Sequence, residues 1–290
     1  MAKRKTQKPS RPNIAFLTDE LLYEYQFGIW SGVASAAEEK DVNLICAIGR
    51  SLRSPYEFES QSNIIYDLIG EENVEGVIIM GASMGARIDI TEMLEFCQKY
   101  RPLPIVSIGL ALEGIPSLLV DNEKGMRDVL VHFLEVHNYR RIAFIRGPAF
   151  NKEAEIRYRT YVNVLTEYGI PLETDLVIPG DFIRPTGAAA VNMLLDERRV
   201  EFDAIIAAND NMALGALDAL HARGLKVPHD VALAGFDNVR ETKLSTPPLT
   251  TVGQPLQEQG RKALDMLLAV MQNQEVAHEI TLPTHAVIRQ

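Results

Sequence analysis

The chain has little cysteine: among its 290 residues only Cys46 and Cys97 carry a thiol. Neither stands at metal-ligand spacing, so both are expected to be reduced thiols in the interior of a cytoplasmic protein. The basic start is not followed by the apolar stretch of roughly 7–15 residues that a secretory signal needs. No window approaches the roughly 18 apolar residues of a membrane span. These absences argue against secretion and against membrane insertion.

Several catalytic motifs are absent together. The sequence contains neither phosphate-binding pattern, G-x-x-x-x-G-K-S/T or G-x-G-x-x-G after a strand, and no G-x-S-x-G, H-E-x-x-H or C-x-x-C. The six histidines are scattered, without a partner at ligand spacing. Gly81–Gly85 (GASMG) follows an apolar run but lacks the lysine and spacing of a phosphate loop, and a strand-to-helix turn is the plainer interpretation. The chain is predicted not to be an enzyme and to need no cofactor or metal.

Charge is distributed unevenly. Residues 1–11 hold five of the 29 basic groups and no acidic one, which leaves 24 basic against 39 acidic groups in the rest. An acidic body repels phosphate backbones, so no direct nucleic-acid binding is expected from it. The segment 1–11 is interpreted as a basic flexible tail.

Short β-branched runs alternate with amphipathic stretches, which is typical of βαβ units on a parallel sheet. The predicted strands and extended segments are 13–18, 43–49, 74–81, 103–109, 117–122, 140–147, 176–182, 203–210 and 230–238, with a terminal strand pair in 279–290. The predicted helices are 28–40, 63–68, 93–100, 129–136, 155–168, 188–197, 212–222 and 258–271. The pattern begins anew after about residue 120. It predicts an α/β fold of two doubly wound parallel-sheet lobes, suited to hinge closure on a ligand.

Polar and aromatic side chains follow the predicted strands in both blocks, where open α/β sheets bind ligands. They are Tyr25 and Phe27 after the first strand, Arg157 and Phe182 in the second block, and Asn209, Asp210 and Asp237 with Asn238 after its later strands. Singly, an Asp or Asn at such a point is more often a helix cap or turn residue. Their recurrence favours a site for a small polar molecule, with carboxylate acceptors, arginine and asparagine donors and an aromatic cover.

Several stretches carry a resemblance to a known family. They are VDNEKG (120–125), RRIAFIRGP (140–148), PGDF (179–182), ANDNMALGALDAL (208–220), GLKVPHDVALAGFDN (224–238) and TPPLTTVGQP (246–255). In this order and spacing they resemble the effector-binding core of the lactose- and galactose-repressor (LacI/GalR) family, itself similar to periplasmic sugar-binding proteins.

The resemblance implies a type I periplasmic-binding-protein fold with three crossings between lobes. The lobes are predicted at 12–119 plus 250–278 and at 120–249 plus 279–290. It also implies roles: Arg157 and Asp237 grip polar ligand atoms, Phe182 covers the ligand, and Asn209 and Asp210 line the second lobe's side. Tyr25 and Phe27 are the first lobe's contribution. A homodimer is expected, as is typical of the family.

One departure affects the function. Repressors of this family begin with a helix-turn-helix headpiece of about sixty residues, whereas here the first strand is predicted near Asn13, so no recognition helix fits before it. One interpretation, which we favour at this point, is a ligand-sensing domain, such as the N-terminal sensor of a histidine kinase or diguanylate cyclase. The alternative is the effector and dimerisation core of a DNA-binding repressor whose headpiece has been removed.

The ligand class follows only coarsely from the residue types. One arginine among several acids favours a neutral sugar or nucleoside over a phosphorylated molecule. Binding is expected to act by population shift, since the ligand stabilises the closed state through its differential affinity. Asp237→Ala and Arg157→Ala are predicted to abolish binding and to leave the fold intact.

Overall fold

The computed structural model describes residues 11–56 and 58–289. Most of the predicted basic tail therefore lies outside the described residues; Arg11 forms an ion pair with Asp41 at 2.6 Å. The chain divides into two compact units, each built from separate segments. The first unit holds the described residues up to Met84 with Ile90–Leu118 and Leu256–Ile280, and the second holds Gly85–Asp89, Leu119–Pro255 and the residues from Thr281 onward.

The first unit is a six-stranded sheet in the order β11-β5-β4-β3-β1-β2. Its strands are β1 (Asn13–Thr18), β2 (Asn43–Ile48), β3 (Gly76–Ile79), β4 (Ile105–Ile108), β5 (Ser117–Val120) and β11 (Glu279–Leu282). The pairs from β2 through β1, β3 and β4 to β5 are parallel. Strands β3 and β4 are buried along their whole length, as expected where helices cover both faces of a parallel sheet.

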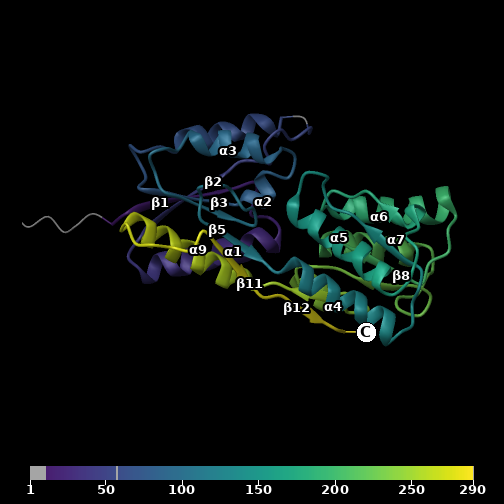
Figure 1. Ribbon diagram of the computed structural model, residues 1–290. Helices are drawn as coiled ribbons and strands as arrows, with labels where there is room; N and C mark the ends of the chain where they lie inside the picture. The colour runs from purple at the N-terminus through teal and green to yellow at the C-terminus, as the bar shows by residue number, and fades with distance from the viewer. Residues whose placement is uncertain (1–10, 57, 290) are drawn as a thin grey trace, which may run out of the picture. The chain divides into compact units, whose positions relative to one another are not determined.

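The helices of the first unit are α1 (Glu24–Glu39), α2 (Gly81–Met84), α3 (Ile90–Gln98), α9 (Leu256–Met271) and the 3₁₀ segment η1 (Ser60–Leu68). Within this unit, α1 and α9 lie side by side on one face of the sheet and α3 lies on the other (Figure 1). Glycines allow α1 and α9 to approach closely: a methyl group on Gly32 would lie 2.1 Å from the Gln257 carbonyl oxygen, and one on Gly260 2.1 Å from that of Ile29.

Gly32→Ala is therefore expected to lower the free energy of unfolding by about 1–3 kcal/mol, because the obstacle is backbone and the two helices must separate. Gly28→Ala on the same helix is the matched control, since its new methyl would meet chiefly the flexible side chain of Leu256. Urea denaturation of both variants measures the difference. Equal stability of the two would show that the α1–α9 contact has room for the methyl group.

The second unit has a four-stranded parallel sheet in the order β7-β6-β8-β9 and a two-stranded antiparallel sheet of β10 and β12. The strands are β6 (Ile142–Ile145), β7 (Val177–Ile178), β8 (Ala204–Ala207), β9 (Ala232–Ala234), β10 (Thr251–Gly253) and β12 (His285–Val287). The helices are α4 (Asn122–Glu135), α5 (Lys152–Glu167), α6 (Arg184–Asn192), α7 (Asp210–Ala222) and α8 (Arg240–Leu244), with a 3₁₀ turn η2 (Thr174–Leu176) and a π-helical end of α6, η3 (Met193–Arg198). A continuous apolar core fills this unit.

The predicted α/β fold with parallel sheets is confirmed, and several local predictions need correction. Helix α4 begins at Asn122, well before the predicted start at residue 129. Helix α1 begins at Glu24, so Tyr25 and Phe27 lie in its first turn and not in a loop. The strand predicted over 176–182 is only Val177–Ile178, and α8 was not anticipated. Strands β11 and β12 do not pair with each other: β11 joins the six-stranded sheet and β12 pairs with β10.

The boundaries of the units also differ from the predicted lobes. Residues 250–255 belong to the second unit, because β10 pairs with β12 there, whereas they were expected in the first. Within the described part of the chain, no helix is long and apolar enough to cross a membrane.

Candidate functional site

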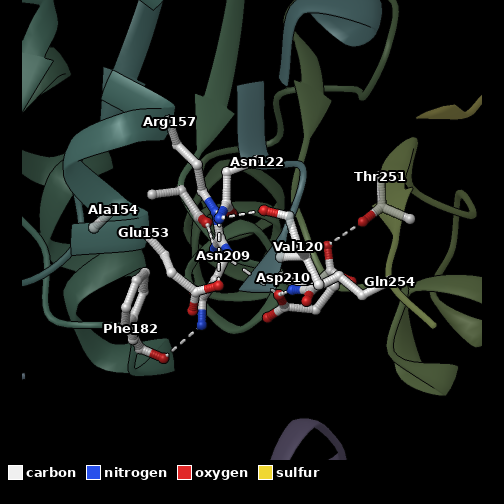
Figure 2. A network of polar contacts seen from close by, with 12 residues as sticks. Val120, Asn122, Glu153, Ala154, Arg157, Phe182, Asn209, Asp210, Thr251 and Gln254 are labelled. Carbon is white, nitrogen blue, oxygen red and sulfur yellow. Dashed lines mark hydrogen bonds and ion pairs between the residues drawn. The ribbon is translucent and has the colours of Figure 1, made fainter. Parts of the chain in front are cut away.

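A buried polar network in the second unit centres on Arg157 of α5 (Figure 2). Arg157 is 2% exposed. Its Nε donates to Asn122 Oδ1 at 2.8 Å, and its Nη1 donates to the Ala208 carbonyl oxygen at 2.8 Å. Asn122, at the start of α4, donates in turn to Glu153 Oε1 at 3.3 Å. These bonds hold the guanidinium in one orientation.

Asp237 stands beside this guanidinium, on the segment that follows β9. Its Oδ1 lies 3.9 Å from Arg157 Nη1, beyond the usual range of about 2.7–3.2 Å for a direct hydrogen bond. Gln254 Nε2 donates to the same oxygen at 2.7 Å. The residue is 7% exposed. Arg157 and Asp237 are thus each hydrogen-bonded to other partners, and their facing atoms are not in direct hydrogen-bond contact.

The network contains more carboxyl groups than arginines: Asp237, Asp210 and Glu153 lie around Arg157. Burial raises the pKa of Asp237 well above its ordinary value; the nearby Asp210 and Glu153 carboxylates raise it further, and Arg157 opposes the rise. Burial likewise raises the pKa of Asp210 to about 6, against the hydrogen bonds that it accepts. A neutral or hydrogen-donating ligand suits such a site better than an anion.

Two aromatic rings lie beside the Arg157 guanidinium. The guanidinium carbon lies 3.8 Å from the centre of the Phe236 ring and 6.0 Å from that of Phe182. Phe182 has a left-handed backbone, with φ of 63°, and lies partly buried. A methyl group on Gly147 would come within 2.5 Å of the Phe182 ring, so the glycine makes room for this ring.

Asn209 and Asp210 lie at the start of α7. The Asn209 side chain caps the helix by accepting from the Met212 amide at 3.0 Å and donates to the Phe182 carbonyl oxygen at 3.0 Å. Asp210 is fully buried, and its carboxylate accepts from the Thr251 hydroxyl at 2.6 Å and from the Val239 amide at 2.9 Å. These contacts favour structural roles: Asn209 caps α7, and Asp210 holds neighbouring segments through its hydrogen bonds. Ligand contact by either residue stays a prediction.

Tyr25 and Phe27 belong to the first unit, and the remaining five predicted residues lie together in the second. Phe27 is 49% exposed and packs against Trp30, with the ring centres 5.4 Å apart. Between the two predicted positions, Gln26 is buried and its amide reaches the Asp19 carboxylate at 3.5 Å. Asp19 also accepts from the Ser83 hydroxyl at 2.6 Å.

Three residues of the network were missed by the sequence reasoning: Asn122, Glu153 and Gln254. Asn122 and Gln254 are separated from their partners by many positions, so no local spacing marks them; Glu153 stands four residues before Arg157 on α5, a spacing common to many exposed helical pairs. Asn122 and Gln254 lie inside stretches that carry the family resemblance, VDNEKG and TPPLTTVGQP, which was the only available signal. Among the described residues no group of three or more His, Cys, Asp or Glu is placed to hold a metal ion.

Comparison with known proteins agrees with this architecture. Residues 131–290 match the family model described as "Periplasmic binding protein-like domain". The HTH-type transcriptional repressor CytR of Escherichia coli (strain K12) is 34% identical over 217 residues, which cover 74% of this chain and 62% of that protein. The chain thus spans less than two thirds of that relative's length.

Two solved structures extend the likeness to nearly the whole chain. A transcriptional regulator CelR–cellobiose complex has a TM-score of 0.81 at 29% identity, covering 97% of this chain and 85% of that one. A dimeric lac repressor with a C-terminal deletion has a TM-score of 0.78 at 25% identity, covering 96% and 97%. The proteins matched are named as regulators of transcription and not as enzymes, in agreement with the missing catalytic motifs. The chain belongs to the periplasmic binding protein-like family and, within it, to the effector domains of LacI-type transcription regulators.

Proposed function

We propose that this chain binds a small hydroxylated molecule, a sugar or a nucleoside, at the Arg157–Asp237 pair and serves as the effector domain of a cytoplasmic LacI-type repressor. The observation that carries the proposal is the buried pair itself, with Arg157 Nη1 and Asp237 Oδ1 separated by 3.9 Å. A hydroxyl group can donate to the carboxylate and accept from the guanidinium at once. Such charge-assisted bonds contribute roughly 1.5–3 kcal/mol each.

The comparisons favour this repressor interpretation over the one preferred from the sequence. CytR is named a transcriptional repressor and CelR a transcriptional regulator, whereas nothing supports the sensor of a histidine kinase or diguanylate cyclase. The CelR structure is titled a cellobiose complex, which supports a sugar as one ligand class. Closure of the two units on the ligand stays a prediction.

A thermal-shift screen tests the ligand part of the proposal. We expect at least one sugar or nucleoside from a panel that includes cellobiose and cytidine to stabilise the chain, by about 2.7 kcal/mol at 100 times its dissociation constant. The shift should vanish in Asp237→Ala. Asp128→Ala, which removes an exposed carboxylate paired with Lys124 on α4, is the matched control and should keep it. A ligand that shifts both variants equally would place binding elsewhere.

We also propose that a second copy of the chain covers the outer edge of the first unit's sheet. Strand β2 is the last in the order and, among the residues that the structure describes, has a neighbouring strand on one side only. Its Ile45 and Ile48 are 38% and 46% exposed, and Ile64 and Leu68 on the adjoining η1 are 70% and 61% exposed. Exposed apolar side chains along an open strand edge mark an association surface. The dimeric lac repressor supports a second copy as the occupant.

Ile48→Glu is expected to convert a dimer into a monomer, because burying a carboxylate at an apolar contact costs several kcal/mol. Sedimentation equilibrium of the purified chain measures the change in mass. Ile288→Glu, at another exposed isoleucine, is the control and should stay dimeric. A wild-type chain that sediments as a monomer at all concentrations would contradict this interface.

A further inference from the structure

The turn that carries Asp237 has an unusual backbone. Asp237 has a φ of 124° and the next residue, Asn238, a φ of 59°, so two successive non-glycine residues lie in the left-handed region. Such a backbone conformation is unfavourable for a residue with a side chain and persists only where its surroundings hold it. The conformation of this turn decides where the Asp237 carboxylate stands relative to Arg157.

Three successive amides of the turn are held by different groups. The Asp237 amide donates to the Val252 carbonyl oxygen at 2.9 Å, and the Val239 amide donates to Asp210 Oδ2 at 2.9 Å. Between them the Asn238 amide donates to the Thr251 hydroxyl at 3.2 Å. Strand β10 and the start of α7 therefore fix the backbone of the turn from one side.

The side chain of Asn238 is held by an arginine from the far end of the sequence. Arg289, just after β12, donates through Nη2 to Asn238 Oδ1. Its Nη1 donates to the Thr242 hydroxyl at 2.9 Å and to the Leu249 carbonyl oxygen at 2.8 Å. Its backbone amide donates to Thr250 Oγ1 at 3.1 Å. All of these acceptors are neutral, so the guanidinium acts here as a rigid fork and not as one half of an ion pair.

From these contacts we infer that Arg289 is a positioning residue for the ligand site: it holds Asn238 in the left-handed conformation and thereby sets the Asp237 carboxylate opposite Arg157. The inference rests on the proposed function for its effect on ligand affinity, while the effect on the turn concerns the free protein alone. Thr242, which accepts from Arg289, also donates to the Val239 carbonyl oxygen at 2.7 Å, so Arg289 contacts the turn directly at Asn238 and through Thr242 at Val239.

Arg289 acts on the network through its positive charge in addition to its hydrogen bonds. Burial raises the pKa of Asp210 to about 6, and Arg289 is among the groups that oppose this rise. A lysine in its place keeps the charge and one donor but cannot bridge Asn238, Thr242 and Leu249 as a planar fork. Arg289→Lys and Arg289→Met therefore separate the charge from the geometry.

The test compares Arg289→Met, Arg289→Lys and a matched control, Arg261→Met, which removes an exposed arginine paired with Glu39 in the first unit. In the free protein we expect amide hydrogen exchange at Asn238 and Val239 to speed up about tenfold in Arg289→Met, less in Arg289→Lys and not at all in the control. Carbon-detected NMR titration should place the pKa of Asp210 higher in Arg289→Met than in the wild type. The dissociation constant of cellobiose, or of whichever panel compound binds, should rise about tenfold.

Two results would overturn the inference. One is exchange at Asn238 and Val239 in Arg289→Met that matches the control. The other is exchange that speeds up equally throughout the second unit, which would show that Arg289 only stabilises the fold. If the turn loosens as expected but no compound binds the wild type, the positioning role is supported and the proposed function fails.

Discussion

Arg157→Ala is expected to lower the free energy of unfolding by about 3–5 kcal/mol, in addition to abolishing ligand binding. Arg157 is 2% exposed, and removal of its guanidinium would take its donors away from Asn122 Oδ1 and the Ala208 carbonyl oxygen. It would also leave Asp237 and Glu153 without the positive charge between them. The sequence alone led to the expectation that this variant keeps its fold intact; the burial and the contacts of Arg157 argue otherwise.

Urea unfolding followed by circular dichroism measures this loss. Arg159→Ala is the matched control on the same helix, because Arg159 is exposed and forms a surface ion pair with Glu155, and it should lose no more than about 1 kcal/mol. Arg157→Lys should fall between the two, since an ammonium group cannot keep both hydrogen bonds and the contact with the Phe236 ring. A variant Arg157→Ala as stable as Arg159→Ala would mean that the network contributes little to folding.

Asp237→Asn is expected to have the opposite effect on the free protein: it should lose the ligand yet become more stable at pH 8, by on the order of 1–2 kcal/mol. Burial raises the pKa of this carboxyl in the folded state. The stabilisation from its proton is therefore complete below its unfolded pKa and is lost as pH rises through its folded pKa. Asparagine carries no charge to bury, and its oxygen can still accept from Gln254.

The pH dependence is what identifies the cause. Toward pH 4, where the raised pKa of Asp237 favours its protonated form in the folded protein, wild type and Asp237→Asn should differ little, and the difference should grow toward pH 8. Asp210→Asn is the control: both Asp210 oxygens accept hydrogen bonds, so an amide nitrogen would face the Val239 amide or the Thr251 hydroxyl. It should lose about 1–3 kcal/mol at pH 8. A gain for Asp237→Asn that is equal at both pH values would exclude relief of a buried charge.

Much of the fold and part of the site were predictable because they depend on local pattern. Apolar runs such as 13–18 and 203–210 predicted strands that the structure contains, since a strand buried on both faces must be apolar along its length. The polar and aromatic residues after the strands predicted in the second block included Arg157, Phe182 and Asp237, because parallel strands end at the same edge of a sheet. The helix start at Glu24 was placed too late, as no capping side chain precedes it.

The sequence by itself determined the α/β class, the family, and five residues that the second unit brings together. Tertiary structure decided what each of these residues contacts: Asp210 is fully buried and Asn209 caps a helix, while Arg157 and Asp237 stand 3.9 Å apart. It also supplied the partners Asn122, Glu153, Gln254 and Arg289, and joined β12 to β10 instead of β11. These pairings depend on segments brought together by the burial of the sheets, and no spacing along the chain encodes the distance between two such side chains.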